Sequence, residues 1–171
     1  RFEENGVRMA DGTFHELDVV ALATGFKTDR FIRPATVRGV DGLELDTFWS
    51  KRPTAHYAVG LPGFPNFFML NGPTGPVGNF SLIDIAERQW DYISQLLSPI
   101  FSGEKQTVMP SAEAHAAYEE RRIDAARKTV FASGCQSWYL DAEGVPGTWP
   151  WSYQAFADAM ASPDFDEYSY T

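Results

Sequence analysis

Cysteine, histidine and long hydrophobic runs are all scarce in this sequence of 171 residues, and each shortage narrows what the chain can be. The one cysteine, Cys135, cannot form a disulfide within the chain, which favours a reducing compartment, and we expect a cytoplasmic location. No apolar run approaches the roughly 18 residues needed to span a bilayer, so we expect no membrane partner. The histidines, at positions 15, 56 and 115, lie too far apart for a local metal motif. We therefore predict no metal site and a surface or structural role for each of them.

Positive charge is also in short supply. The 14 Lys and Arg residues are outnumbered by 23 Asp and Glu, which gives a formal net charge of −9. A charge of that sign repels phosphate backbones and argues against a nucleic-acid partner. Motifs for self-contained catalysis are missing as well: there is no H-E-x-x-H, no cysteine pair and no nucleophile elbow. Cys135 is either a reactive thiol or a small buried side chain, and we assign no catalytic residue.

The first 25 residues predict paired strands. Residues 7–9 and 14–17 flank a turn at residues 10–13, a pattern typical of a hairpin. The continuous apolar run at residues 19–23 then predicts a central strand that is covered on both faces, as in a parallel sheet. Because the chain offers few neighbours for such a strand, we expect it to be a piece of something longer.

The remainder alternates turns, one short strand and helices. Residues 67–70 predict a buried strand, and residues 71–80 form a glycine-rich loop. A helix should begin at Ser81, which has capping-box spacing to Asp84. We expect a second helix from 112 to about 130 with Ser111 as N-cap, and a short third one from 153 to about 160. The predicted apolar face of the first helix is Leu82, Ala86, Trp90, Ile93 and Leu97, and the charged run at 119–122 in the second is predicted to be solvated.

The glycine-rich loop has two interpretations. A strand, a glycine loop and a helix in succession let a ligand approach bare backbone N–H groups at the positive end of the helix. The spacing is G-x-x-G-x-x-G, however, which is neither the dinucleotide fingerprint G-x-G-x-x-G nor a phosphate-binding P-loop. A tight turn without a ligand fits the pattern equally well.

Four segments resemble flavoprotein monooxygenases of the Baeyer–Villiger type. DVVALATGF at 18–26 resembles their D-x-x-x-x-A-T-G-[FY] segment, and LPGFPNFFML at 61–70 resembles V-P-G-F-P-N-L-F-x-L. Residues 72–81 align without gaps on G-P-N-T-x-x-G-H-x-S. SWYLD at 137–141, followed by Trp-Pro at 149–150, is similar to S-W-Y-x-D … W-P. The order and spacing agree over nearly the whole chain, from about residue 18 to about residue 168.

This resemblance implies an α/β fold, namely the C-terminal portion of a flavoprotein with two Rossmann-like dinucleotide-binding domains and here an incomplete sheet. Residues 1–25 would end the NADPH-binding domain and form the crossing strand. Residues 26–171 would be the C-terminal part of the FAD-binding domain, with an aromatic C-terminal extension. The G-x-G-x-x-G fingerprints for FAD and NADPH are absent from the sequence. We therefore expect weak or absent FAD binding and no activity from this chain alone.

The implied activity uses FAD and NADPH to insert one oxygen atom from O₂ into a ketone, through a flavin C4a-peroxide. The partners would be a small organic substrate, O₂ and the N-terminal part of the same enzyme. Trp138 and Tyr139 either wall the substrate pocket or pack in the core. Gly25 either contacts cofactor or allows a tight crossing between domains. The candidate cofactor-binding residues are Thr24, Gly25, Gly72, Pro73, Gly78, Asn79, Phe80 and Ser81.

The sequence departs from the family pattern within the loop. Thr74, Gly75 and Pro76 stand where N-T-N is common, and Asn79 stands where His is common. Asparagine forms hydrogen bonds but does not change charge near neutral pH, so a role that needs a titrating imidazole would be lost. Two alternatives stay open: a flavin-containing monooxygenase that oxidises sulfur or nitrogen, and a non-catalytic interaction module that uses a remnant of this fold.

Overall fold

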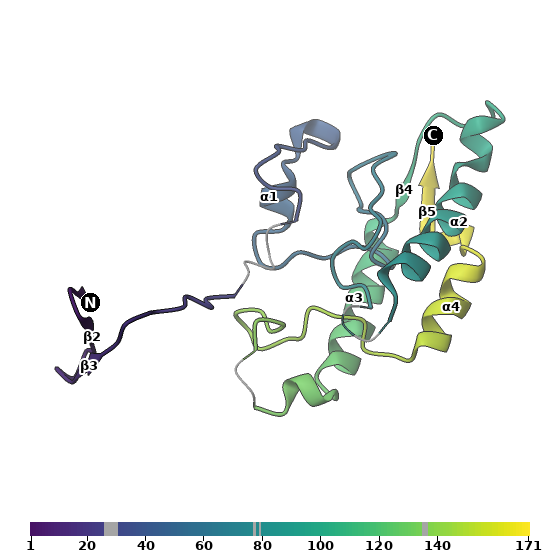
Figure 1. Cartoon of the computed structure of the whole chain (residues 1–171). Helices are drawn as coiled ribbons and strands as arrows, with labels where there is room; N and C mark the ends of the chain where they lie inside the picture. Colours follow the sequence, from purple (N-terminus) through teal and green to yellow (C-terminus); the bar gives the residue numbers. More distant parts are fainter. Residues whose placement is uncertain (26–30, 77, 79, 135–136) are drawn as a thin grey trace.

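The computed structural model describes residues 1–25, 31–76, 78, 80–134 and 137–171. Figure 1 shows two parts: an N-terminal hairpin, and a helical body that contains the rest of the chain. Residues 17–25 continue from the hairpin without helix or strand, and the hairpin lies apart from the body. In the described part of the chain, no helix combines the length and apolarity that crossing a bilayer requires.

The predicted hairpin is confirmed. Strand β2 (Gly6–Arg8) pairs antiparallel with β3 (Phe14–Glu16), with Val7 opposite His15, and a short β1 (Phe2–Glu3) pairs with the other edge of β2. The turn is closed by the Asp11 carboxylate, which accepts the backbone N–H of Thr13 at 2.9 Å. The hairpin is therefore determined by its local turn chemistry.

The strand predicted at residues 19–23 does not form. This stretch is extended but has no assigned strand, and Val19 and Leu22 are 81% and 72% exposed. An apolar run becomes a central strand only where strands on both sides take up its N–H and C=O groups. The described residues provide no such neighbours for this run, so the prediction is wrong for this structure.

The body is built around three helices and a small sheet. Helices α2 (Leu82–Phe101) and α4 (Tyr153–Ala161) pack together, and α3 (Ala112–Ala126) lies beside them. Strands β4 (Val108–Pro110) and β5 (Tyr168–Tyr170) pair antiparallel, and short 3₁₀ turns lie at Val130–Ala132 and Phe165–Glu167. The main core contains Ile85 and Leu96 of α2, Tyr118 of α3, and Phe156 and Met160 of α4.

The helix starts agree with the capping prediction. The hydroxyl of Ser81 accepts the N–H of Asp84, and the hydroxyl of Ser111 accepts the N–H of Ala114. Ser152 caps α4 in the same way. Serine at the N-cap satisfies a backbone donor that the helix itself leaves without an acceptor.

The buried face of α2 agrees with the predicted one at Ile93, and Leu97 packs against the core, but the two faces differ elsewhere. Leu82 and Trp90 are 50% and 56% exposed, whereas the buried residues are Ile85, Gln89, Tyr92, Ile93 and Leu96. The reason is Gln89, which is fully buried because its amide accepts the N–H of Asn71 and donates to the carbonyl of Ala58. An apolar pattern cannot place a polar residue at the centre of a buried face.

A second, smaller core lies under residues 31–69. It includes the 3₁₀ turn Val40–Gly42 and helix α1 (Leu45–Phe48). The strand predicted at 67–70 is reduced to one isolated bridge between Gly60 and Phe68, and Leu70 is 49% exposed. Asn66 and Asn71, which flank the run, have positive φ values of 57° and 52° and interrupt the extended backbone. The members of this core are Leu45, Trp49, Ala55, Leu61, Phe64 and Met69.

Candidate functional site

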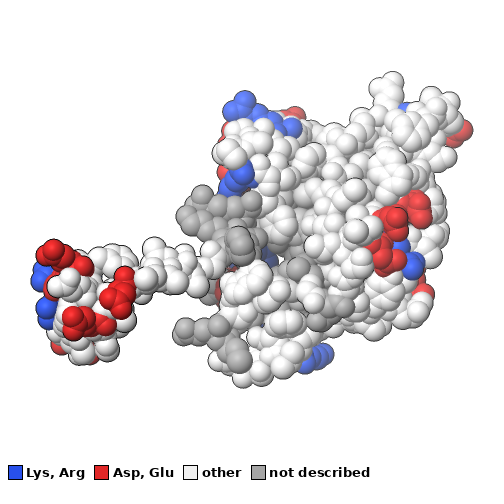
Figure 2. All heavy atoms as spheres, in the orientation of Figure 1, with Lys and Arg blue, Asp and Glu red and all other residues white. Residues whose placement is uncertain are grey.

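A cavity of about 330 Å³ lies where the glycine-rich loop, the start of α2 and the C-terminal aromatic segment meet. Its wall is mostly apolar, and stretches far apart in the sequence contribute to it. Figure 2 shows one face of the molecule, on which charged side chains gather on the N-terminal hairpin while the body is largely uncharged. The lining comprises Phe31, Arg52, Pro53, Asn71, Pro73, Thr74, Leu82, Arg122, residues 138–141 and residues 146–148.

The first half of the glycine loop is packed inside the protein. A Cβ at Gly72 would lie 2.3 Å from the carbonyl oxygen of Ala58, so only glycine fits there. Gly75 is also buried, and its carbonyl accepts the N–H of Trp149 at 3.0 Å. Pro73 lines the cavity. Packing thus accounts for Gly72, and its predicted contact with a cofactor stays a prediction.

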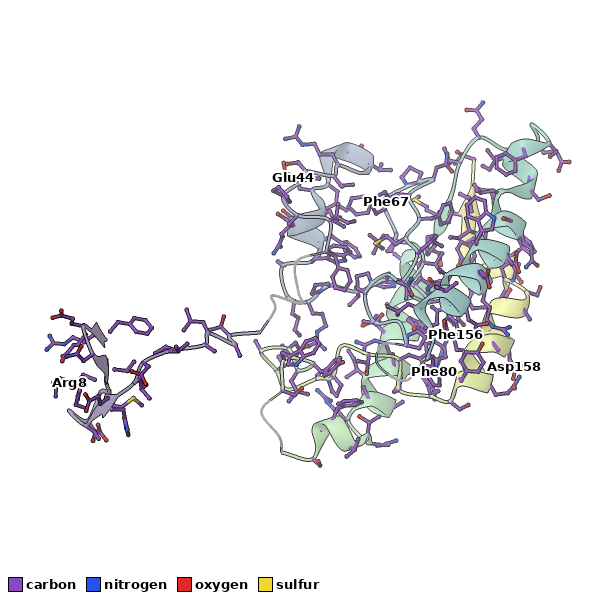
Figure 3. The ribbon with its side chains drawn as sticks, viewed as in Figure 1. Arg8, Glu44, Phe67, Phe80, Phe156 and Asp158 are labelled. Carbon is purple, nitrogen blue, oxygen red and sulfur yellow. The ribbon has the colours of Figure 1, made fainter. Side chains whose placement is uncertain are left out.

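In the second half of the loop, the structure describes Gly78, which is exposed, and Phe80, which is half-buried. Gly78 has a φ of 91°, and a Cβ on it would lie 3.3 Å from the Tyr139 hydroxyl. Ser81 and the first two side chains of α2 are exposed, so this end of the helix is accessible. Asn79 lies outside the described residues. Phe80 turns toward α4, as Figure 3 shows, where its ring lies 5.0 Å from that of Tyr153.

A polar cluster sits at the first turn of α2. The Tyr153 hydroxyl donates to the Asp84 carboxylate, and Arg88 donates to both, at 3.3 Å to Asp84 and 2.9 Å to Tyr153. The hydrogen bond from Tyr153, followed by that from Arg88, lowers the pKa of the Asp84 carboxyl. Arg88 therefore compensates the negative charge that Asp84 brings to the helix N-terminus.

Trp138 and Tyr139 form part of the cavity wall. Their rings are stacked with centroids 4.2 Å apart and an angle of 22° between the planes, and Trp138 is 55% exposed. Tyr139 also contacts Phe131 at 5.3 Å. The sequence left open whether this pair lines a pocket or packs in the core, and in the structure both residues line the cavity. Contact with a substrate stays a prediction.

The two aromatic residues belong to a hairpin, residues 137–149, which we call the wall hairpin. Leu140 bridges to Pro146, and the N–H of Gly147 donates to the carbonyl of Tyr139 at 2.8 Å. At the tip, the Asp141 carboxylate accepts the N–H groups of Glu143 and Val145 at 2.8 and 2.9 Å. These bonds fix the hairpin internally.

Arg52 holds the tip of the wall hairpin from outside. Its Nη1 lies 3.0 Å from Asp141 Oδ2, and its Nη2 donates to the Glu143 carboxylate. The Lys51 ammonium also pairs with Glu143, at 2.8 Å. Hydrogen bonding from Lys51 is the largest cause that lowers the pKa of Glu143. Two cations and two carboxylates thus neutralise one another at this edge of the cavity.

The prediction of a solvated charge run at 119–122 is wrong for two of its residues. Arg122 is fully buried and Glu119 is 9% exposed. Arg122 donates from Nε and Nη2 to the two carboxylate oxygens of Glu119, at 2.7 and 2.9 Å, and from Nη1 to the carbonyl of Pro146 at 3.0 Å. A charge is tolerated inside a protein when it is paired and hydrogen-bonded, and here each of the three guanidinium nitrogens donates a hydrogen bond.

Sequence reasoning missed Arg52, Asn71 and Arg122 as cavity residues. For Arg122 a signal existed, because helical periodicity puts it on the same face of α3 as Tyr118 and Ala126, both buried. Nothing local marks Arg52 or Asn71. The Oδ1 atom of Asn71 is buried and accepts no hydrogen bond from the described residues.

Thr24 and Gly25 lie apart from the cavity. Both are exposed in the segment between hairpin and body, and a Cβ on Gly25 would meet no atom within 4 Å. The φ of Gly25 is 76°, a conformation that favours glycine. The structure therefore does not bring these two candidates together with the loop residues.

The histidine predictions hold for the positions that the structure buries. His56 Nε2 lies 3.1 Å from Glu167, and His115 Nε2 lies 3.2 Å from the Thr54 hydroxyl. Burial lowers the pKa of His115 to about 4. Within the described ranges, no three His, Cys, Asp or Glu side chains are grouped so that they could hold a metal ion.

Comparison with known proteins identifies relatives of this chain. No family model matches it. It is 42% identical over 166 residues to an uncharacterized monooxygenase of Mycobacterium bovis, 34% identical over 156 residues to an FAD-binding monooxygenase of Aspergillus niger, and 33% identical over 139 residues to a Baeyer–Villiger monooxygenase of Pseudomonas aeruginosa. The chain is a relative of the Baeyer–Villiger-type flavoprotein monooxygenases.

The monooxygenase match covers most of this chain and a minor part of each relative. It spans 97%, 88% and 80% of the chain but 34%, 26% and 26% of the three proteins. Among solved structures, cyclohexanone monooxygenase from Rhodococcus sp. Phi1 bound to NADP⁺ superposes with a TM-score of 0.77 at 29% identity, over 98% of this chain and 33% of that one. The chain thus matches the C-terminal part of the cyclohexanone monooxygenase fold.

Proposed function

We propose that this chain forms the C-terminal part of an FAD- and NADPH-dependent monooxygenase that inserts one oxygen atom from O₂ into a ketone. The observation that carries the proposal is the meeting of three features at one cavity: the glycine loop, the N-terminus of α2 and the stacked Trp138 and Tyr139. The relatives whose names include FAD-binding and Baeyer–Villiger monooxygenase support it.

The residues at this cavity fit a flavin. An isoalloxazine ring has broad apolar faces and a polar edge with both N–H and C=O groups. The cavity offers a mostly apolar wall and the Asn71 Oδ1 atom, which accepts no hydrogen bond from the described residues. Gly78 and Ser81 are exposed, and Ser81 directly precedes the cavity residue Leu82. We propose that Pro73, Gly78 and Ser81 contact FAD. When bound, FAD would supply the redox chemistry that uses NADPH to activate O₂.

The N-terminus of α2 contributes electrostatics. Its N–H groups favour negative charge placed beside the first turn, by about 0.3–1 kcal/mol at an exposed site and more where water is excluded. Arg88 keeps the Asp84 carboxylate from cancelling that effect, since it pairs with Asp84 at 3.3 Å. We infer that this helix end stabilises charge on the pyrimidine edge of a reduced flavin.

The division of the chain between two domains is also a proposal. Residues 1–25 would end the NADPH-binding domain, and residues 26–171 would complete the FAD-binding domain. The exposed apolar side chains of Val19 and Leu22 support this division, because an apolar strand of this kind needs covering strands. We infer that the sequence that precedes the matched part in the relatives supplies them.

The test is oxygenation of cyclohexanone by the full-length protein, expressed with any coding sequence upstream of Arg1. The protein is loaded with FAD and given NADPH and ¹⁸O₂. We expect a flavin absorbance spectrum, NADPH oxidation that depends on ketone, and a lactone that carries one ¹⁸O atom, with the other oxygen atom released as water.

Two further arms separate the alternatives. Methyl phenyl sulfide in place of the ketone tests sulfur oxidation, and a product from the sulfide but from no ketone would contradict the proposal. A protein that retains no FAD and oxidises no NADPH would favour a non-catalytic module. Trp138→Ala serves as the cavity variant, and Trp90→Ala, on the exposed face of α2, is its matched control.

A further inference from the structure

The guanidinium of Arg122 is fully buried and lines the cavity, and each of its three nitrogens already donates a hydrogen bond within the protein. Its Nε and Nη2 atoms donate to Glu119, and its Nη1 atom donates to the Pro146 carbonyl. The ion pair is neutral as a unit, so it brings no net charge to the cavity. Binding of an anion therefore does not explain why the Arg122–Glu119 pair is buried beside the cavity.

The bond to Pro146 connects Arg122 with the aromatic wall. Pro146 is bridged to Leu140, and the next residue, Gly147, donates its N–H to the carbonyl of Tyr139 at 2.8 Å. Tyr139 is stacked on Trp138. Two backbone-directed hydrogen bonds thus connect α3 with the backbone of Tyr139, and stacking connects Tyr139 with Trp138.

The return strand of the wall hairpin is also fixed at its end, because the N–H of Trp149 donates to the carbonyl of Gly75 at 3.0 Å. That bond ties the end of the hairpin to the glycine loop. The hydrogen bond from Arg122 to Pro146 fixes the middle of the return strand to α3. The position of Tyr139 relative to the loop, where its hydroxyl lies 3.3 Å from a Cβ built on Gly78, depends on both.

We propose that Arg122 is a positioning residue for the cavity: its hydrogen bond to the Pro146 carbonyl holds the wall hairpin so that Trp138 and Tyr139 face the glycine loop. Glu119 makes this possible, because it orients and neutralises the guanidinium. The inference rests on the proposed function only where it concerns the substrate. The placement of the two rings is independent of any activity.

The effect of Arg122 on protein stability can be separated from its effect on the position of the wall hairpin. Removing one partner leaves an uncompensated buried charge, whereas replacing both by apolar residues of similar volume is often neutral for stability. The double variant E119L/R122M should therefore fold with an unchanged or higher melting temperature. It nevertheless lacks the donor to Pro146, so the wall hairpin loses its middle anchor. E119M/R122L removes the same donor with a different apolar pair and serves if the first variant fails to fold.

The experiment uses the full-length protein labelled with 5-fluorotryptophan. The chain contains five tryptophans, and the Trp138 resonance is assigned with Trp138→Phe. In both double variants we expect the ¹⁹F resonance of Trp138 to shift or broaden while that of Trp90 stays in place. The matched control is Arg121→Met, which removes the same charge from the exposed neighbouring position of α3 and should leave Trp138 unchanged.

Kinetics with cyclohexanone and NADPH give the second readout. If the displaced wall weakens ketone binding, we expect about a tenfold rise in KM for the ketone, with the melting temperature unchanged or higher. A folded double variant with the wild-type Trp138 resonance and wild-type KM would overturn the inference. If the wild-type protein oxidises no ketone, the proposed function fails, and the ¹⁹F measurement still decides the role of Arg122.

Discussion

Substituting Gly72 with alanine tests whether the first glycine of the loop is there for packing. The added Cβ would lie 2.3 Å from the Ala58 carbonyl oxygen, so the backbone must move by about 0.7 Å to reach even a 3.0 Å contact. Ala58 is fully buried, and its carbonyl accepts a hydrogen bond from the Gln89 amide. Movement at this point therefore disturbs the centre of the buried face of α2.

The expected loss has two parts. Overpacking of a close-packed interior costs about 1–3 kcal/mol. Weakening the bond to Gln89, whose side chain is fully buried, adds about 1 kcal/mol or more because its amide is left without an acceptor. We expect G72A to lose about 3 kcal/mol of unfolding free energy. For a domain of this size, that corresponds to a fall in Tm of roughly 6–12 °C.

The assay is urea unfolding followed by tryptophan fluorescence, with Gly75→Ala as the matched control. A Cβ on Gly75 would contact Ala58 Cβ and the Gly72 carbonyl oxygen at 3.2 Å, which a small adjustment relieves. We expect a loss of about 1 kcal/mol or less for G75A. If G72A were as stable as G75A, the packing explanation for Gly72 would be refuted.

Other predictions concern buried polar groups and a cap. Burial lowers the pKa of His115 to about 4, below the value near 6.5 of the unfolded chain, so the unfolded chain binds more protons between these values. The stability contributed by keeping His115 neutral should be fully present above about pH 6.5. The free energy of unfolding should fall by about 3 kcal/mol as the pH drops toward 4. His115→Gln should flatten this dependence in urea unfolding at pH 7 and pH 4.5, and an equal acid loss in the variant would contradict it. Ser111→Ala should cost about 1 kcal/mol in thermal melts, because the first turn of α3 loses its cap; no change would argue against the capping role. Tyr168→Phe should cost about 1–2 kcal/mol, since the buried Tyr92 hydroxyl, 2.9 Å from that of Tyr168, loses its partner. Tyr170→Phe, at the partly buried end of the same strand, should cost less, and equal losses would count against the reasoning.

Local signals in the sequence predicted the parts of the fold that depend on local chemistry. The serines at 81 and 111 identified two helix starts, because capping is decided within four residues. The turn around Asp11 identified the hairpin for the same reason. Such features need no knowledge of distant residues.

Features that depend on distant partners were predicted less well. Residues 19–23 form a strand only where other strands flank them, and the described residues include none that do so. Gln89 is buried because Asn71 and Ala58 offer it partners from another part of the chain. The apolar pattern around Gln89 predicts neither partner.

The candidate site likewise contains features that the sequence predicts and features that depend on distant partners. Resemblance to a family identified the loop and the aromatic pair, and the structure has Pro73, Trp138 and Tyr139 at one cavity. The arginines at its edge were missed, because a charged residue is expected to be solvated unless a partner is known. For Arg122 those partners, Glu119 and the Pro146 carbonyl, become visible only when α3 packs against the wall hairpin.

The pairing of these arginines bears on the kind of substrate that the cavity accepts. Arg52 is paired with Asp141 and Glu143, and Arg122 with Glu119, so each cation at the cavity has its own carboxylate. An anionic substrate would have to displace one of these partners, and Arg122 could not release Glu119 without leaving a buried charge uncompensated. A cationic substrate would find all three carboxylates already engaged. These ion pairs support our proposal of an uncharged substrate, such as a simple ketone, that is held by apolar contacts.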